Sequence, residues 1–362
     1  MPAADGATYA PTGKPNPVLR DGETFPIAAV AFDHGHIHGQ INGLIEAGAT
    51  LRWVFSEPEH AEQAGAVAEK HGARVADTLE QVLEDPAVRL VAAAAVPSER
   101  AALGIRCMEA GKDYFTDKTP LTTLEQLDAV RAAVERTGKK YAVYFSERLH
   151  VECAMHAGTL IEQGAIGRVI HVTGFGPHRL GDPASRPDWF YQRAKYGGIL
   201  TDIGSHQIEQ FLHYAGCKDA RVQASKIGNY NHPDQPELDD FGDCTLVGDN
   251  GATMYFRVDW FTPTGLRAWG DGRTFIVGTE GTIELRKYVD LAKPDLVGDV
   301  LLLANRDGEQ RMELAGEVGF PFFGRLIRDC LDRTENAMTQ AHALKAAELC
   351  VRAQMQAEKV AG

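Results

Sequence analysis

Short apolar runs alternate with amphipathic segments across residues 26–146, and few folds accept such an order. Runs such as PIAAVAF and LVAAAAV have the length of strands buried on both faces. The clearest helical segment is TTLEQLDAVRAAVERTG, in which Thr122 is followed three residues later by Glu125, as in a capping box. Strands and helices in this order form βαβ units around a parallel sheet. We therefore expect a doubly wound, Rossmann-type α/β domain over residues 26–146.

The second half of the chain has a different pattern. After the helical segment ECAMHAGTLIEQG, strand-like runs such as RVIHVTGFG, ATMYFRVDWFT and TIELRKYV follow one another, separated by turn signals. We expect residues 147–362 to form an α+β domain with a large, mostly antiparallel sheet for substrate binding and oligomerisation. Residues 1–25 are polar and rich in Pro and Gly, and we expect a loosely ordered N-terminal arm.

The composition of the chain argues against two kinds of binding partner, nucleic acids and membranes. The net charge is −13, and an acidic surface repels phosphate backbones, so we expect no nucleic-acid partner. No apolar run approaches the ~18 residues that a membrane span needs, and the N-terminus lacks the apolar core of a secretory signal. The six cysteines are scattered without a CxxC pair, which is typical of reduced core thiols. These features predict a cytoplasmic protein without a membrane partner.

The stretch AFDHGHIHG lies between the first strand and the first helix, where doubly wound sheets bind a dinucleotide pyrophosphate. Of the three glycine positions of GxGxxG, which fall at Asp33, Gly35 and His38, only Gly35 matches. We expect Gly35, His36 and Ile37 to contact the cofactor. A carboxylate is unfavourable beside phosphates, so Asp33 has to turn away from them if a dinucleotide binds.

Glu57 ends the second strand-like run, about 20 residues after Gly35, where an acidic residue bonds the ribose hydroxyls. Its charge would repel a 2′-phosphate. We therefore expect NAD as the cofactor, with NADP as the other possibility.

The three histidines, His34, His36 and His38, suggest a metal site as the alternative. Alternate residues share one side of a strand, but the strand ends before His34 and Gly35 breaks the geometry. No cysteine or carboxylate cluster lies near them in the sequence to complete a zinc site. We therefore predict no metal here.

Several stretches together resemble the glucose–fructose oxidoreductase / inositol dehydrogenase / MocA family of NAD(P)-dependent oxidoreductases. They are SEPEH, VPSER, EAGKDYFTDKTPL, KYGGILTDIGSHQIEQFLHYAG and IVGTEGTIEL, and the resemblance covers most of residues 26–350. It implies a small-molecule substrate such as a sugar, a sugar derivative or an inositol. It also implies a homo-oligomer, which we expect to be a dimer or a tetramer.

The resemblance also implies functional residues. Lys118 matches the lysine of a Glu-Lys-Pro motif, and Asp202 and His206 match an Asp-x-Gly-x-His helix start, so the three are the expected catalytic residues. Pro97, Asp117 and Lys118 are expected at the cofactor. The sequence departs from the family pattern at three positions: Arg100 replaces a His, Asp117 a Glu and Thr119 a Pro.

Elementary chemistry supports the same three residues. Oxidation of an alcohol moves a hydride to the cofactor and leaves a proton for a protein base. His206 suits that role because its unperturbed pKa lies near neutrality. Asp202, four residues earlier, shares a helix face with it and would orient the imidazole. Lys118 ends a predicted strand and would stabilise negative charge on the substrate oxygen.

The segment before this helix, GPHRLGDPASRPDWFYQRAKYGG, is rich in aromatic and hydrogen-bonding side chains that suit a polyhydroxylated ring. Two other functions remain open. One is an NAD-dependent hydrolase or lyase that oxidises a sugar transiently, and the other is a non-catalytic dinucleotide sensor. The substrate-binding candidates are Arg148, His178, Arg179, Trp189 and Tyr196.

Overall fold

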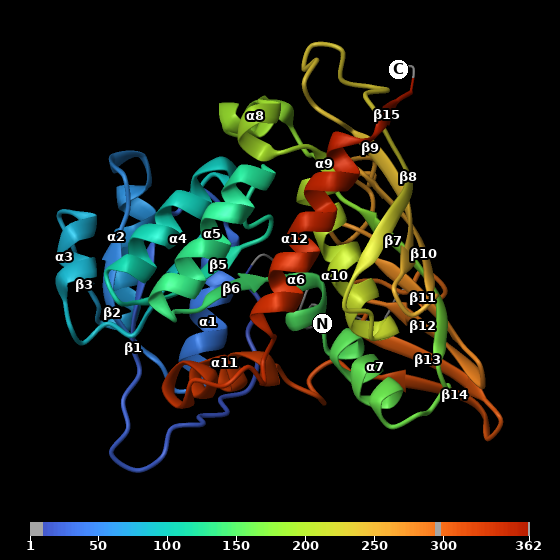
Figure 1. The fold of residues 1–362 in the computed structure, drawn as a ribbon, viewed down its shortest axis with the longest axis horizontal. Coiled ribbons are helices and arrows are strands. Elements are labelled where there is room, and N and C mark those ends of the chain that lie inside the picture. Colours follow the sequence, from blue (N-terminus) through green and yellow to red (C-terminus); the bar gives the residue numbers. More distant parts are fainter. Residues whose placement is uncertain (1–9, 294–297, 361–362) are drawn as a thin grey trace. The chain divides into compact units, whose positions relative to one another are not determined.

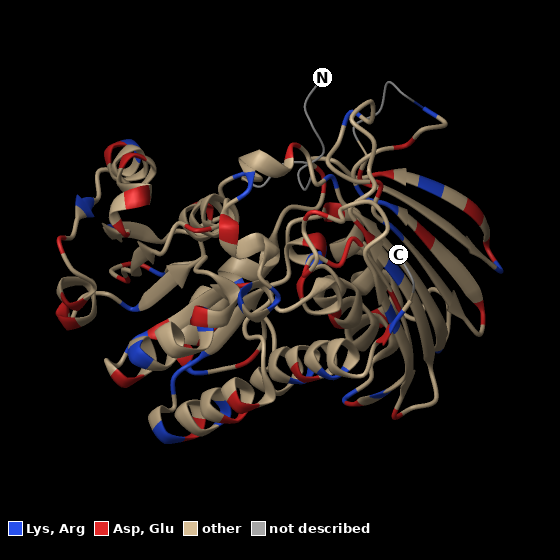
Figure 2. Ribbon diagram, turned by 90° about the horizontal axis from the view of Figure 1, so that it is seen from above, with Lys and Arg blue, Asp and Glu red and all other residues tan. Residues whose placement is uncertain are grey.

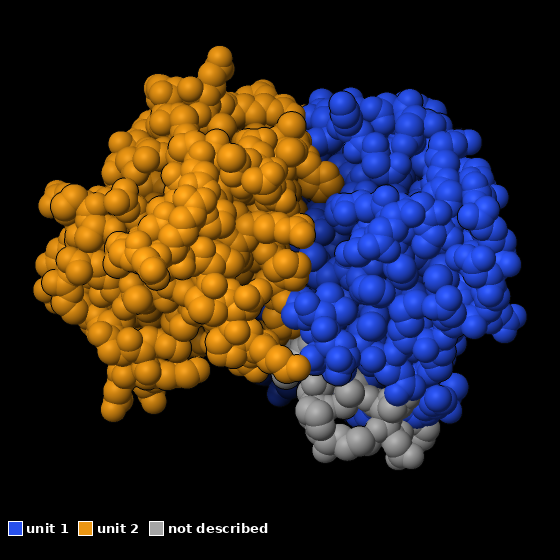
Figure 3. Space-filling view, turned by 90° about the horizontal axis from the view of Figure 1, so that it is seen from below, with its two compact units in different colours: residues 1–8, 145–319, 345–362 blue, residues 9–144, 320–344 orange. Residues whose placement is uncertain are grey.

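The computed structural model describes residues 10–293 and 298–360. They form two compact units, shown in separate colours in Figure 3. We call residues 10–144 with 320–344 the parallel-sheet unit, and residues 145–319 with 345–360 the large-sheet unit. Residues 320–344, which the sequence pattern assigns to the second domain, group with the parallel sheet in the structure.

A six-stranded sheet in the order β3-β2-β1-β4-β5-β6 forms the centre of the parallel-sheet unit (Figure 1), and all its neighbouring strands are parallel. Every residue of β4 and β5 is buried, as expected for central strands covered on both faces. The doubly wound fold predicted from the sequence is confirmed. Its strands are β1 (Pro26–Val30), β2 (Thr50–Phe55), β3 (Arg74–Val75), β4 (Leu90–Ala93), β5 (Asp113–Asp117) and β6 (Tyr141–Tyr144), and its helices are α1 (His36–Glu46), α2 (Ala61–His71), α3 (Leu79–Glu84), α4 (Arg100–Glu109), α5 (Leu124–Thr137) and α11 (Pro321–Asp332).

Local signals set both ends of α5. The helix ends at Gly138, whose φ of 64° is the left-handed conformation that glycine adopts readily. At its start the N-cap is Thr123, whose hydroxyl accepts the N–H of Gln126 at 3.2 Å. The predicted box of Thr122 and Glu125 was therefore wrong by one residue. Gln126 is the answering side chain, and its Oε1 accepts the N–H of Thr122 at 2.8 Å.

The large-sheet unit contains a nine-stranded sheet in the order β14-β13-β12-β11-β7-β10-β9-β8-β15. Neighbours are antiparallel except in the pairs β7–β10 and β8–β15, so the mostly antiparallel sheet is confirmed. Alternate residues of β9 are buried because one face packs on helices, with α10 against β7 and β10. The strands are β7 (Val169–Pro177), β8 (Ala220–Gly228), β9 (Phe241–Gly248), β10 (Thr253–Asp259), β11 (Arg273–Gly278), β12 (Gly281–Arg286), β13 (Val300–Asn305), β14 (Gly308–Glu313) and β15 (Glu358–Lys359), and the helices are α6 (Ser146–Leu149), α7 (Glu152–Glu162), α8 (Arg193–Tyr196), α9 (Ile199–Asp202), α10 (Gly204–Ala215) and, continuing from the other unit, α12 (Gln340–Met355).

The sequence pattern missed α11 and the strands at the two ends of the large sheet. β14 has the sequence GEQRME and is almost entirely exposed. An edge strand of this kind needs no apolar alternation, since charged residues protect it from pairing with other chains. The hydrophobic periodicity of the sequence therefore does not reveal β14.

The N-terminal arm is better ordered than we expected. The backbone N–H of Asn16 donates to Glu46 O at 2.8 Å, and that of Val18 donates to Ala47 O at 3.0 Å. These bonds attach the arm to the C-terminal end of α1. Residues 1–9 of the predicted arm lie outside the described residues.

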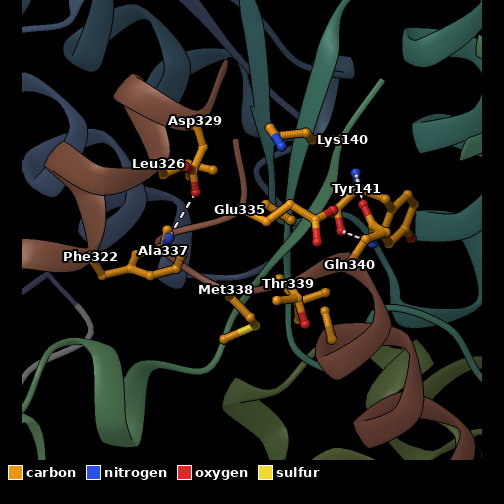
Figure 4. A pocket seen from close by; sticks show the side chains of 13 residues that line it. Lys140, Tyr141, Phe322, Leu326, Asp329, Glu335, Ala337, Met338, Thr339 and Gln340 are labelled. Atoms are coloured by element: carbon orange, nitrogen blue, oxygen red, sulfur yellow. Dashed lines mark hydrogen bonds between the residues drawn. The ribbon is translucent and has the colours of Figure 1, made fainter. Parts of the chain in front are cut away.

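The edge strand β6 is completed by a side chain (Figure 4). Gln340 accepts the N–H of Tyr141 at 2.8 Å and donates to its carbonyl at 2.9 Å, as a neighbouring strand would. The pocket beside it, between β6, α11 and the start of α12, has a volume of about 20 Å³, which is room for about one water molecule. No predicted site residue lines this pocket.

The two units do not differ in how their charged residues are distributed. Acidic and basic positions are interspersed along both (Figure 2). All six cysteines are buried and unpaired. Within the described part of the chain, no helix combines the length and apolarity that crossing a membrane requires.

Candidate active site

The first turn of the parallel-sheet unit joins β1 to α1 and is tied to the end of β4. The N–H of His34 donates to Ala94 O at 3.1 Å, and the N–H of Ala94 donates to Ala31 O at 3.0 Å. α1 begins at His36, after Gly35, and its first amide N–H, that of His36, donates to Nδ1 of His34 at 3.2 Å. Amides at a helix start of this kind suit an anion such as a pyrophosphate.

Asp33, the residue that breaks the glycine pattern, faces His60. Its Oδ1 lies 3.5 Å from Nε2 of that ring. Burial raises the pKa of the Asp33 carboxyl, and His60 opposes this shift. His60 ends a single turn that follows Glu57, which is exposed two residues beyond β2. The carboxylate is thus directed toward the segment that follows the second strand.

Two further predicted cofactor residues are buried. Ile37 is fully buried within α1, and its N–H donates to His34 O at 3.3 Å. Pro97 begins the single turn Pro97–Glu99 that follows β4.

Asp117, the last residue of β5, accepts hydrogen bonds from three directions. Its Oδ1 accepts from Nδ1 of His36 and from the N–H of Lys118, both at 2.8 Å. Its Oδ2 accepts from Nη2 of Arg100 at 3.1 Å. Burial alone would raise the pKa of the Asp117 carboxyl, but His36 and Arg100 outweigh it and hold the pKa far below its usual range. Asp117 is therefore an ionised carboxylate that joins the first turn to β5.

His34 brings a second imidazole to this carboxylate, with 3.4 Å between its Nδ1 and Oδ2 of Asp117. The same Nδ1 accepts the N–H of His36 at 3.2 Å, and burial together with His36 lowers the pKa of His34 far below its usual value. Ligand atoms of His34, His36 and Asp117 lie within 4.8 Å of one another, close enough to hold a metal ion. Our argument that no carboxylate accompanies the histidines was therefore wrong.

Sequence distance hid this cluster, because 81 positions separate His36 from Asp117. The guanidinium of Arg100 already places a positive charge on the same carboxylate, which opposes a divalent cation. The absence of a metal at this site stays our prediction.

Arg100 begins α4 and holds the backbone of the predicted catalytic lysine. Its Nε donates to Ala95 O at 2.6 Å, and its Nη1 donates to Thr119 O at 2.9 Å and to Lys118 O. The side chain of Lys118 is only 6% exposed. Of the three departures from the family pattern, Arg100 therefore contacts the other two, Asp117 and Thr119.

In the large-sheet unit, Gly197 and Gly198 form the turn before the predicted catalytic helix, with φ angles of 89° and 94°. A Cβ on Gly198 would lie 2.2 Å from the side chain of Gln354. That amide accepts the N–H of Leu200 and donates to Asp239, both at 2.9 Å. The backbone conformation requires glycine at position 198, and a side chain there would displace the hydrogen-bonded amide of Gln354.

Asp202 ends α9, and His206 is the third residue of α10. Ile203, between the two helices, has φ −74° and ψ −38°, which is right-handed helical backbone. The four-residue spacing therefore keeps Asp202 and His206 on one helical face. His206 is buried and Asp202 is half-buried. This pair belongs to the large-sheet unit, whereas Lys118 belongs to the parallel-sheet unit.

α10 carries a buried polar face that the sequence analysis missed. Gln207 Nε2 and Lys287 Nζ both donate to Glu147 Oε2 at 3.1 Å, and the same Nζ donates to Gln210 Oε1 at 2.8 Å. All four side chains are at most 2% exposed. Buried charges of this kind need partners, but nothing in the local sequence pairs Lys287 with Glu147.

Arg148, a predicted substrate residue, forms a forked ion pair with Glu209. Its Nε lies 2.9 Å from both carboxylate oxygens, and its Nη2 also donates to Oε1. Burial would lower the pKa of Arg148, but the charge of Glu209 outweighs it and raises that pKa. The pair links α6 to α10 inside the large-sheet unit.

His178 follows β7 among aromatic side chains. Its ring centroid lies 5.5 Å from that of Trp260 and 4.3 Å from that of Trp269. Its Nδ1 lies 3.1 Å from Gly176 O, and its Nε2 lies 3.8 Å from Glu147 Oε1. An imidazole, aromatic faces and a carboxylate therefore meet at one point.

The other substrate candidates differ in their surroundings. Arg179 Nη2 donates to three backbone carbonyls within residues 263–268, and so orders that loop. The hydroxyl of Tyr196 accepts the N–H of Asp239 at 2.9 Å, in the network around the glycine turn. Trp189 is half-buried beside Phe190.

Two family models match the chain. Residues 46–145 match the model described as oxidoreductase family, NAD-binding Rossmann fold. Residues 155–284 match the GFO/IDH/MocA C-terminal domain.

Curated relatives match part of the chain. D-xylose dehydrogenase of Paenarthrobacter nicotinovorans is 34% identical over 148 residues, which is 39% of this chain and 37% of that protein. The scyllo-inositol 2-dehydrogenase (NAD(+)) of Bacillus subtilis (strain 168) is 27% identical over 208 residues, 56% of each chain. The matches thus span from about a third to just over half of these relatives.

A solved structure matches almost the whole chain. It is described as an oxidoreductase from Erwinia carotovora atroseptica SCRI1043, and it is 51% identical with a TM-score of 0.89. The match covers 93% of this chain and 100% of that one. From these matches and the fold, the chain belongs to the GFO/IDH/MocA family of oxidoreductases.

Proposed function

We propose that this protein is an NAD-dependent dehydrogenase that oxidises a hydroxyl of a sugar, a sugar derivative or a cyclic polyol to a ketone. The observation that carries this proposal is the placement of Lys118 directly after β5, where Asp117 and Arg100 hold its backbone. Ligands of doubly wound sheets bind beyond the carboxyl ends of the strands. The names of the two curated relatives specify xylose and scyllo-inositol, which supports a polyhydroxylated substrate.

The first turn fits a dinucleotide in two respects. The turn leads into the N-terminus of α1, where an anion is favoured, and the carboxylate of Asp33 has a partner in His60. Glu57 would bond the ribose and disfavour a 2′-phosphate, hence NAD over NADP. When bound, the nicotinamide supplies the hydride acceptor. The proposed cofactor contacts are Gly35, His36, Ile37, Glu57, Pro97, Asp117 and Lys118.

The protein's own residues handle the proton. We assign His206 as the general base that removes the hydroxyl proton, and Asp202 as the carboxylate that orients its ring and stabilises its charged form. The ammonium of Lys118 donates to the substrate oxygen and stabilises the negative charge that develops there. A buried histidine and a buried lysine act in a low dielectric, where such interactions are stronger than in water.

His178 and Trp189 are the candidates best suited to direct substrate contact, since aromatic faces and an imidazole bind polyhydroxylated rings. Arg148, Arg179 and Tyr196 bond partners inside the large-sheet unit, so we assign them to shaping the substrate site.

A panel of sugars and cyclic polyols, assayed with NAD and with NADP, tests the proposal. We expect NADH to accumulate, with NAD bound more tightly than NADP in calorimetry. Lys118→Ala and His206→Ala should each reduce kcat by about 10²–10⁴-fold while NAD binding is retained. Product formation without net NADH would indicate a hydrolase or lyase instead. Binding of NAD without turnover of any substrate would indicate a sensor.

A further inference from the structure

We propose that Arg100 is the positioning residue for Lys118, acting on it through the backbone and through Asp117. This inference rests on the proposed catalytic role of Lys118. Arg100 was not among the site residues expected from the sequence.

The hydrogen bonds of Arg100 converge on the residues around Lys118. Its guanidinium donates to the carbonyls of Lys118 and Thr119 and to the carboxylate of Asp117, while its Nε donates to Ala95 beyond the end of β4. One rigid planar group thus joins the end of β4 to the three residues that end and follow β5. Lysine cannot reproduce this, because an ammonium is a point charge without the planar fork.

A net gain in the stability of the folded state does not account for the buried ion pair of Arg100 and Asp117. The side chains of Arg100 and Asp117 are 1% and 0% exposed. Removing two charges from water costs much of what their attraction returns, so an apolar pair of similar volume is often at least as stable. Placement of the segment that carries Lys118 is a role that an apolar pair would not fill.

Asp117 connects the hydrogen-bond network of Arg100 to the first turn, between β1 and α1. Its Oδ1 accepts from His36 at the start of α1 and from the N–H of Lys118. β1, β4 and β5 are neighbours in the sheet, so the network spans three adjacent strand ends. Arg100 therefore sets the position of Lys118 relative to the turn that we assign to the cofactor.

The opposite end of β5 supplies a matched control. There Arg333 pairs with Asp113, the first residue of the strand, at 2.7 Å, and it also donates to the carbonyls of Gly138 and Cys330. It is the same kind of clamp on the same strand, at the end away from Lys118.

The experiment compares Arg100→Lys, Arg333→Lys and the unaltered protein. We expect Arg100→Lys to lower kcat about 100-fold, since misplacement by about 1 Å has this effect, with KM for NAD little changed. The primary deuterium isotope effect on kcat, measured with substrate deuterated at the oxidised carbon, should increase because hydride transfer becomes rate-limiting. Arg333→Lys should change only the melting temperature.

A folded Arg100→Lys variant with unaltered kcat and isotope effect would overturn the inference. If this variant does not fold, Arg100→His takes its place, because the imidazole of the family pattern lacks the planar fork and leaves Asp117 unaltered. A lower kcat with a larger isotope effect in this second variant then supports the inference, and an unaltered kcat and isotope effect overturn it. An unaltered protein that reduces no NAD would refute the proposed function itself, whereas a fully active Arg100→Lys beside an inactive Lys118→Ala would refute only the role of Arg100.

Discussion

Arg148 and Glu209 show how single residues are constrained by burial. Both side chains are at most 5% exposed, and each neutralises the other. In the sequence Arg148 suggested a substrate contact because it follows a strand end. Its partner lies 61 positions away, on α10, so the local sequence contains no sign of the pair.

Removing one member of this pair should be costly. We expect Glu209→Leu to lower the free energy of unfolding by about 3–5 kcal/mol, because it leaves the guanidinium buried without its carboxylate. The double variant Arg148→Met with Glu209→Leu should recover most of the loss. Urea denaturation of the two variants and the unaltered protein measures both effects, and a single variant as stable as the double would contradict this account.

At the scale of elements, the strand edges distinguish the two sheets. β14 protects one end of the large sheet with charged side chains, whereas β6 is completed by the amide of Gln340. The amide serves as a strand because it presents one acceptor and one donor at the spacing of a peptide group. Only the return of residues 320–344 to the parallel sheet places it there.

Gln340→Leu should lower the free energy of unfolding by about 1–2 kcal/mol, the usual contribution of two hydrogen bonds. Exchange of the Tyr141 amide hydrogen should become faster because its acceptor is lost. Gln356→Leu, at an exposed position just past α12, is the control for the added apolar surface. Slow exchange at Tyr141 in the Gln340 variant would show that the side chain does not complete the strand.

At the scale of the whole molecule, the outer face of the large sheet is the surface we propose for self-association. Half-exposed apolar side chains there include Phe275, Val277 and Leu302, beside a shallow hollow over β11–β14. Phe275 and Leu302 both pair with Glu284 in the sheet register, so this face combines apolar and charged side chains. Apolar side chains exposed together on one face are characteristic of interaction sites.

We expect light scattering to give two or four times the mass of one chain. Leu302→Glu should reduce the oligomer, because the interface would then bury a charge without a partner. The exposed Asp307→Lys, in the turn between β13 and β14 and outside the hollow, is the control for changed charge at the same end of the sheet. A monomer at micromolar concentration would contradict the proposed surface.

The sequence by itself determined the doubly wound sheet, the large antiparallel sheet and the turn after β1, because these depend on local periodicity and on residues close in the chain. The positive φ angles of Gly138 and Gly198 also depend on the local sequence, since glycine is the residue that readily adopts this conformation at a helix end or in a turn.

The tertiary structure alone decided which charges meet. Asp117 joins His36 and Arg100, Arg148 joins Glu209, and Lys287 joins Glu147, at separations of 17 to 140 positions. Burial forces each charge to find a partner, but several chain segments could supply one, and only the packed fold selects it. For that reason Lys118 was recognisable from its motif, whereas Arg100, which holds it, was not.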